Sequence, residues 1–159
     1  MNKIRDFSDP HVIFASLLMI ANRMDTLLTR ELKEFGVTTK QWFLSVTIEN
    51  VFDRPPTMKA LARTMGSSHQ NIKQVAMKLQ QKGLLRLEKD DKDARVTRLR
   101  LTEESHELGR KSESKGEVFI NKMFEDIDDH ELAVAKAVLQ KMLSNLAEMD
   151  HTIADEADE

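Results

Sequence analysis

Cysteine is absent from the 159-residue sequence, and its absence excludes disulfides, thiolate nucleophiles, thiolate metal sites and cysteine redox sensing together. Only five glycines occur, so there is little material for a phosphate-cradling loop. No GxSxG, GxGxxG or HExxH pattern is present. These absences predict a protein that is not an enzyme, with no catalytic residues and no cofactor.

Long apolar runs are also scarce. The N-terminal stretch MNKIRDFSDP lacks the apolar segment and the small-residue cleavage site of a secretion signal. No later run approaches the ~18 apolar residues that span a bilayer. We therefore expect a soluble, cytoplasmic protein with no membrane partner.

Aromatic residues make up 5% of the chain and charged residues 32%, a balance that favours long helices with solvated faces. The charge is unevenly placed. From Met58 to Arg100, eleven basic residues stand against four acidic ones, a local net charge of +7 within an overall −3, so the remainder carries −10. This distribution is typical of a surface that faces phosphates. A solvated charged face is the alternative, and charge alone does not decide between them.

The N-terminal third of the chain predicts two helices. Ser8 followed by Asp9-Pro10 favours a helix start, and apolar residues then recur at three- and four-residue steps until Gly36. Thr38 with Gln41 fits a capping box for a second, short helix, whose apolar face is expected to contain Trp42, Phe43 and Val46. Pro55-Pro56 ends that segment.

The central segment predicts helix, turn, helix and hairpin. Thr57 is a candidate cap for a helix over 58–65, and Gly66 supplies the turn. Ser67 or Ser68 then caps a helix ending at Lys82-Gly83, with Ile72, Val75, Ala76 and Leu79 inward. The period next changes to two, which predicts strands over 84–89 and 95–101 around a charged tip, residues 90–94.

The C-terminal part predicts two long helices, from Thr102 to about Glu125 and from Asp128 or Asp129 onward. The final helix carries apolar residues at a seven-residue step, a narrow seam suited to packing on another helix. A dimer contact and an intramolecular contact both fit this pattern. The candidate dimerisation residues are Leu132, Ala135, Leu139, Met142, Leu146 and Met149.

The second helix of the central segment has an unusual outer face. It offers His, Gln, Asn and Lys rather than a Glu/Lys mixture, and no acidic residue occurs between Met58 and Leu87. Groups of this kind bond phosphates and base edges in the DNA major groove, where carboxylates would be repelled.

TMKALARTMGSSHQNIKQVAMKLQQKGLLRLEKDDKDARVTRLRLTEES, residues 57–105, resembles the central module of the multiple antibiotic resistance regulator (MarR) family, small bacterial transcription factors that work as homodimers. The resemblance implies a mainly α fold of about six helices plus a β-hairpin wing. It implies a winged helix-turn-helix over 37–101 that binds DNA, and a helical dimerisation region formed by 1–36 and 102–159, in one compact unit. Two departures are Ala94, where many members have Arg, and Ser105, which replaces a frequent Gly.

The resemblance also implies roles for individual residues. The second helix of the motif lies in the major groove, and the wing's aspartate orients an arginine, Arg95, for the minor groove. The candidate DNA contacts are Thr57, Ser67, Ser68, His69, Gln70, Asn71, Lys73, Gln74, Lys78, Lys92, Asp93, Arg95 and Arg98. The expected partners are a palindromic double-stranded operator and a second copy of the chain. A winged helix that binds proteins, or an anti-repressor that leaves DNA untouched, is the competing interpretation.

Family members commonly respond to small aromatic or anionic ligands that bind between the dimer helices and the DNA-binding lobe. The candidate lining residues here are Phe14, Met19, Met24, Trp42 and Phe43, for which core packing is the favoured alternative. Glu103, His106 and Glu107 lie close in sequence, but a solvated helix start is favoured over a metal site, and no metal is expected.

Overall fold

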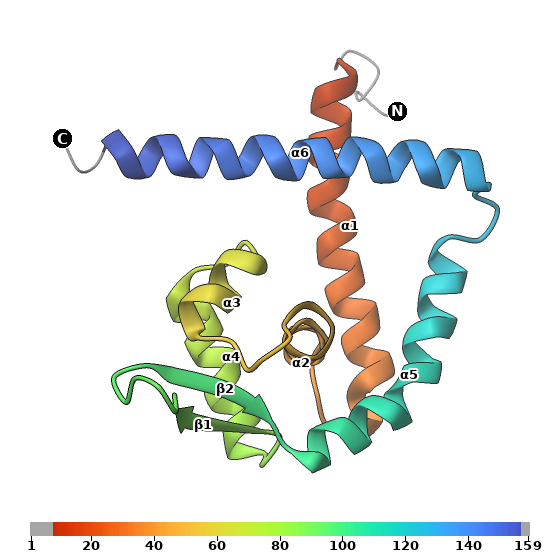
Figure 1. The fold of residues 1–159 in the computed structure, drawn as a ribbon. Helices are drawn as coiled ribbons and strands as arrows, with labels where there is room; N and C mark the ends of the chain where they lie inside the picture. Colours follow the sequence, from red (N-terminus) through yellow and green to blue (C-terminus); the bar gives the residue numbers. More distant parts are fainter. Residues whose placement is uncertain (1–7, 157–159) are drawn as a thin grey trace. The chain divides into compact units, whose positions relative to one another are not determined.

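The structure is a computed structural model that describes residues 8–156, with side-chain surroundings described as far as Met149. Within that range the chain forms six α-helices, one short 3₁₀ helix and one antiparallel hairpin (Figure 1). The predicted mainly α fold with a β-hairpin wing is confirmed.

The contacts divide the chain into two compact units, one reaching Phe119 and the other starting at Ile120. The boundary falls within α5, away from residues 36 and 101, where the DNA-binding and dimerisation regions were predicted to meet. That division concerns function and stays a prediction; its outermost residues, 1–7 and 157–159, lie outside the described range.

Helix α1 (Asp9–Glu31) continues into the 3₁₀ helix η2 (Leu32–Phe35) and ends at Gly36, whose φ of 68° is left-handed. The predicted end near Gly36 is confirmed. Ser8 lies at the N-cap position, but its hydroxyl bonds the Nδ1 atom of His11 at 2.7 Å instead of a backbone N–H group.

The span Asp9–Phe35 is long and apolar enough to cross a membrane by length and composition. The expectation that no such stretch exists is therefore wrong. Core helices of soluble proteins have the same length and composition, and this span carries Arg23 and Asp25, which are costly at membrane depth.

Helix α2 (Thr39–Val51) begins with the predicted capping box: the Thr38 hydroxyl accepts the Gln41 N–H at 3.3 Å, and Gln41 Oε1 accepts the Thr38 N–H at 3.3 Å. Its predicted apolar face is wrong at Phe43, which is 49% exposed. The buried side instead contains Leu44 and Ile48, because α2 packs on α1 and α4 through that side.

Helices α3 (Met58–Thr64) and α4 (His69–Gln81) meet at a turn where Gly66 has a φ of 58°. The Thr57 hydroxyl accepts the Ala60 N–H, and the Ser68 hydroxyl accepts the Asn71 N–H, both at 3.1 Å. Both predicted caps are thus confirmed. The helices bury their apolar sides in one core, which contains Leu61, Ala62, Ile72, Ala76 and Leu79.

Strands β1 (Leu85–Lys89) and β2 (Thr97–Leu101) form the hairpin, with Leu85 opposite Leu101 and Leu87 opposite Leu99. The strands start one and two residues later than predicted. The segment before α3 also pairs with β2, because Thr57 forms an isolated bridge with Arg98 and the Leu99 N–H donates to the Pro56 carbonyl at 2.8 Å. The wing therefore attaches directly to the chain that leads into α3.

Helices α5 (Glu103–Met123) and α6 (Asp129–Glu156) complete the chain. The Thr102 hydroxyl accepts the Ser105 N–H at 3.2 Å, and the Asp128 carboxylate accepts the Glu131 N–H at 2.8 Å, so both helices are capped where predicted. Gly116 lies within α5 beside Trp42: a Cβ atom there would lie 3.3 Å from the Trp42 ring, so glycine allows that ring to approach.

Removing the buried side chain of β2 will destabilise the fold. Leu99 is fully buried, so Leu99→Ala should lower the free energy of unfolding by about 2–5 kcal/mol. Its cross-strand neighbour Leu87 is 37% exposed, and Leu87→Ala should cost less than about 1 kcal/mol. Urea denaturation of both variants measures the difference; equal losses would contradict the placement of the hairpin on the core.

Candidate nucleic-acid interface

Helix α4 presents a continuous polar face. Its buried side is formed by Ile72, Ala76 and Leu79, and the rest of the helix circumference is exposed except at Val75, which is half-buried. Six of the predicted contact residues share that exposed side: His69, Gln70, Asn71, Lys73, Gln74 and Lys78. Ser68 is exposed at the helix start and Ser67 is half-buried. The structure therefore brings these predicted residues together on one surface.

The electrostatics of this face suit an anion. Helix α4 contains no acidic residue, and its N-terminus carries the positive end of the helix dipole. Lys73 and Lys78 add two full positive charges on the exposed side. The surface can therefore approach phosphates without carboxylate repulsion.

The hairpin tip is held by one carboxylate. Asp90 Oδ1 accepts the N–H groups of Lys92 at 2.9 Å and Asp93 at 3.1 Å, while Oδ2 accepts Arg98 Nε. The Arg98 hydrogen bond, helped by the Lys92 N–H group, lowers the pKa of Asp90 from 3.8 to about 2. Arg98 also donates to the Pro55 carbonyl at 2.9 Å. The tip is thus tied to the segment that precedes α3.

Arg98 and Arg95 consequently have different positions. The Arg98 side chain is only 19% exposed and already bonded within the molecule, so it is not free in the way that a groove contact requires. Arg95 is exposed at the tip, and none of the ion pairs found within residues 8–156 involves it.

The remaining candidate DNA contacts in the wing and at the start of α3 also divide into exposed residues and residues bonded within the molecule. The Asp93 carboxylate accepts the backbone N–H of Arg95 at 2.9 Å, so it fixes the backbone rather than the guanidinium. Lys92 is exposed, whereas Thr57 is half-buried and its hydroxyl caps α3. DNA contact by any of these residues stays a prediction.

Lys82 joins the end of α4 to the start of α2, a link that the sequence pattern does not indicate. Its Nζ atom donates to Gln41 Oε1 at 2.8 Å and to the Gly36 carbonyl. Gln41 is buried and also closes the capping box of α2. One side chain therefore fixes the C-terminal end of α4 against the joint between η2 and α2.

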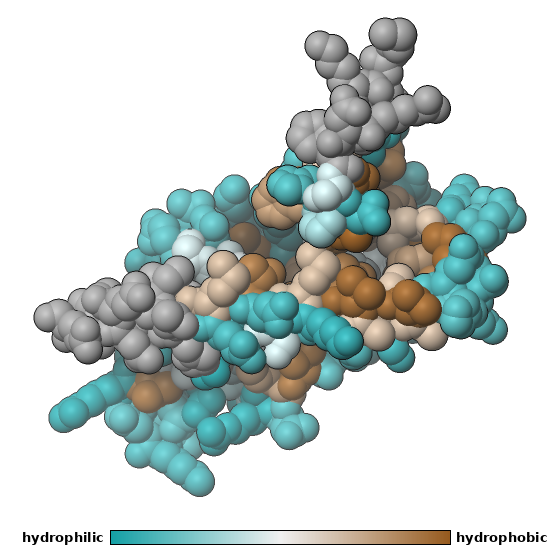
Figure 2. Space-filling view, turned by 90° about the horizontal axis from the view of Figure 1, so that it is seen from above, coloured by the Kyte–Doolittle hydropathy of each residue, from teal (hydrophilic) through white to brown (hydrophobic). Residues whose placement is uncertain are grey.

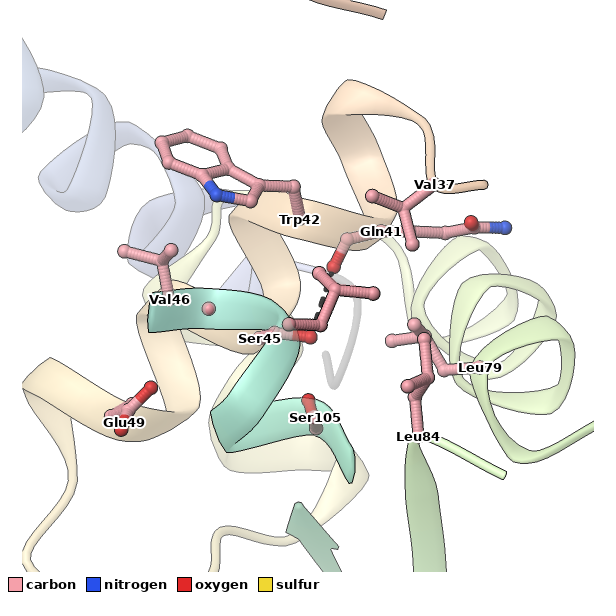
Figure 3. A pocket seen from close by; sticks show the side chains of 11 residues that line it. Val37, Gln41, Trp42, Ser45, Val46, Glu49, Leu79, Leu84 and Ser105 are labelled. Carbon is pink, nitrogen blue, oxygen red and sulfur yellow. Dashed lines mark hydrogen bonds between the residues drawn. The ribbon is translucent and has the colours of Figure 1, made fainter. Parts of the chain in front are cut away.

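A small pocket lies beside α2, with walls from α4, from Leu84 just before β1 and from the first turns of α5 (Figure 3). Its volume of about 20 Å³ fits one water molecule. Of the five predicted ligand residues only Trp42 lines it. Phe14, Met19 and Phe43 are exposed elsewhere and Met24 is half-buried. This pocket does not bring the predicted ligand residues together, and their role in binding an effector stays a prediction.

The three residues considered for a metal site each have another partner. His106 Nδ1 bonds Glu49 at 3.0 Å, Arg110 bonds Glu103 at 3.2 Å, and Lys111 bonds Glu107 at 2.6 Å, which lowers the pKa of Glu107. Within residues 8–156 no three potential ligands gather in a metal-binding arrangement.

Helix α6 exposes its predicted seam. Hydrophobic colour runs along the visible side of this helix (Figure 2). Leu139, Leu146 and Met149 are exposed large apolar residues, Ala135 is exposed, and Leu132 and Met142 are half-buried. Further exposed apolar residues widen the apolar surface beyond the predicted seam: Val134, Val138 and Leu143.

Three comparisons place the fold among known proteins. A family model described as the MarR family matches residues 35–96, which span α2, α3, α4 and most of the wing. The transcriptional repressor MprA of Escherichia coli strain K12 is 23% identical over 146 residues, 91% of this chain and 83% of that protein.

Two solved structures share the architecture. MepR of S. aureus in complex with DNA superposes with a TM-score of 0.76 at 20% identity, over 87% of this chain and 99% of that one. CouR from Rhodococcus jostii RHA1 bound to p-coumaroyl-CoA has a TM-score of 0.73 at 20% identity, over 82% of this chain and 91% of that one. At these identities the likeness establishes the fold.

The ion pair between Asp90 and Arg98 at the wing tip makes stability depend on pH. Because the pKa of Asp90 in the folded protein lies below its ordinary value of 3.8, its contribution to stability is complete above about pH 4 and is lost as the pH falls through 2. Carbon-detected NMR of the carboxyl group should give this low pKa. Arg98→Met should raise it toward 3.8, whereas Arg100→Met, which removes the partner of Glu88, should not. A pKa near 3.8 for Asp90 in the wild-type protein would show that the ion pair with Arg98 is absent.

Proposed function

We propose that this chain is a MarR-family transcriptional regulator, a homodimeric, sequence-specific binder of double-stranded DNA that represses its own or neighbouring genes. The observation that carries this proposal is the exposed, acid-free face of α4. Surface helices ordinarily carry acidic residues, because carboxylates there cost little and aid solubility. Against a phosphate a carboxylate would be repelled, so a face without acidic residues favours an anionic partner. In the same compact unit the wing exposes Arg95 at a tip that is held from within.

The side chains on α4 suit different parts of the duplex. Gln70, Asn71 and Gln74 carry paired donors and acceptors that match adenine edges in the major groove. Lys73 and Lys78 suit phosphates as point charges. Ser67 and Ser68 lie at the helix start, where hydroxyl groups and the helix dipole favour phosphate oxygens. This arrangement gives α4 both base-reading and backbone-binding groups.

The wing supplies a second contact. Arg95 and Lys92 are exposed at the tip, and an arginine entering a narrow, A·T-rich minor groove meets concentrated negative potential. We assign Arg98 and Asp90 to positioning this tip, because their bonds to each other and to Pro55 hold it beside the start of α3. Ala94 removes the second arginine found in many family members, which lowers the charge available to the minor groove.

Dimerisation supplies the symmetry that one helix lacks. A single major-groove contact reads too few base pairs to address a genome, so two-fold copies reading half-sites about 34–36 Å apart are the expected solution. Exposed apolar residues on α6 and on α1 offer surface for the contact between copies. In this proposal residues 1–36 and 102–159 form the dimer, and residues 37–101 bind DNA.

Regulation by a small molecule completes the proposal. The relative MprA is a transcriptional repressor, and CouR has been solved with p-coumaroyl-CoA bound. By analogy, an aromatic or anionic effector would release this protein from its operator. The pocket beside Trp42 is too small for such a molecule in this conformation, so binding would require rearrangement. We place the protein in the cytoplasm, where its operator lies.

Selection of bound duplexes from random DNA tests the proposal and should return a palindrome. On that duplex, Arg95→Ala should weaken binding roughly tenfold or more at fixed salt, with the unfolding midpoint unchanged. Arg110→Ala is the matched control, because Arg110 is an exposed arginine on α5, outside the proposed surface. Unaltered affinity of Arg95→Ala would reject the wing contact. Failure to select any duplex would favour the protein-binding interpretation.

Introducing charged residues into the seam of α6 tests the dimer contact. Leu139→Asp combined with Leu146→Asp should give a monomer in analytical ultracentrifugation at micromolar concentration, because two carboxylates would be buried in the seam. Lys141→Asp, an equivalent change at an exposed charged position on α6, should leave a dimer. A wild-type protein that sediments as a monomer would overturn the proposal.

A further inference from the structure

Met77 lies at the centre of the exposed face of α4, and its side chain is 45% exposed. At about 100° of rotation per residue, Gln70, Gln74, Met77 and Gln81 fall within roughly 60° of one another around the helix. Ile72 and Leu79 mark the opposite, buried side. Met77 is absent from the predicted DNA contacts because it is not polar, yet it points in the same direction as the glutamines.

Single exposed apolar residues are ordinary on protein surfaces. Met77 differs in its neighbours, because the remaining exposed residues of α4 are all Gln, Asn, Lys or His. A thioether carries no charge and no donor, so it gains nothing from a phosphate. An apolar group within the otherwise polar contact is therefore the partner that suits its position.

The major groove offers one such partner. Among the groups that base pairs present there, the C5-methyl of thymine is the apolar one. Methionine is unbranched and flexible, with a polarizable sulfur, so it can adapt its side chain to a methyl group at the groove floor. Gln74 precedes Met77 by three residues, a rise of about 4.5 Å, which is comparable with the 3.4 Å spacing of base pairs.

We propose that Met77 is a specificity-determining residue that contacts the C5-methyl of a thymine in each half-site. The proposal rests on the proposed function, because it requires α4 to enter the major groove. It assigns a thymine to the base pair next to the one read by Gln74. The operator should therefore contain, at one symmetrical position, a thymine whose methyl group contributes to affinity.

Replacement of thymine by deoxyuridine removes only this methyl group. On the selected duplex, each thymine position of the half-site is replaced in turn, symmetrically in both halves, and affinity is measured at fixed salt. For wild type, one symmetrical replacement should weaken binding by roughly fourfold for each methyl group lost, or about fifteenfold for both. Replacements elsewhere should have smaller effects.

Two variants connect that loss to Met77. Met77→Gln keeps a long, unbranched side chain but makes it polar, so it should bind the thymine and deoxyuridine duplexes equally at the sensitive position. Met77→Leu keeps an apolar side chain and should retain the preference for thymine. Both substitutions lie on an exposed helical position and should leave the unfolding midpoint unchanged.

The outcomes separate the two proposals. If wild type binds a selected duplex but no deoxyuridine replacement matters, or if Met77→Gln keeps the full methyl preference, the assignment of Met77 is wrong while DNA binding stands. If wild type binds no duplex, the proposed function itself fails. A sensitive thymine in wild type that becomes insensitive in Met77→Gln alone supports the assignment.

Discussion

Burial of Ile72, Ala76 and Leu79 beneath α4 determines which side of that helix meets solvent. Apolar burial is worth roughly 1.5–3 kcal/mol for each large side chain, so these residues hold the helix against rotation about its axis. The polar residues of α4 therefore all face solvent, on the side opposite the core. Lys82 fixes the far end of the helix to α2, and Ser68 caps the near end. The proposed interface is thus a consequence of the core behind it.

The wing depends on a second internal arrangement, in which charged residues have separate tasks. Asp90 accepts two backbone N–H groups and pairs with Arg98, which in turn bonds the chain before α3. These bonds pair the Arg98 guanidinium within the molecule and keep the tip beside the helix-turn-helix. Arg95 keeps its charge available at that tip. In the wing, Arg98 is therefore held within the molecule while Arg95 is presented to a partner.

Local patterns predicted most of the fold, because helix starts and turns are encoded within a few residues. The Thr38–Gln41 capping box and the caps at Ser68 and Asp128 all involve partners three residues apart. Contacts between distant residues escape such patterns. The bonds from Lys82 to Gln41 and from Arg98 to Pro55 join residues about forty positions apart. The exposure of Phe43 likewise depends on how α2 packs against α1 and α4, which the pattern of residues within α2 does not reveal.

The central claim is that DNA meets the exposed side of α4 and the wing tip. Amide NMR spectra of the protein, recorded with and without its selected duplex, test this most directly. We expect the largest changes at residues 67–78 and 91–95, with little change along the exposed side of α5. Large changes on α5, with the α4 residues unaffected, would contradict the account.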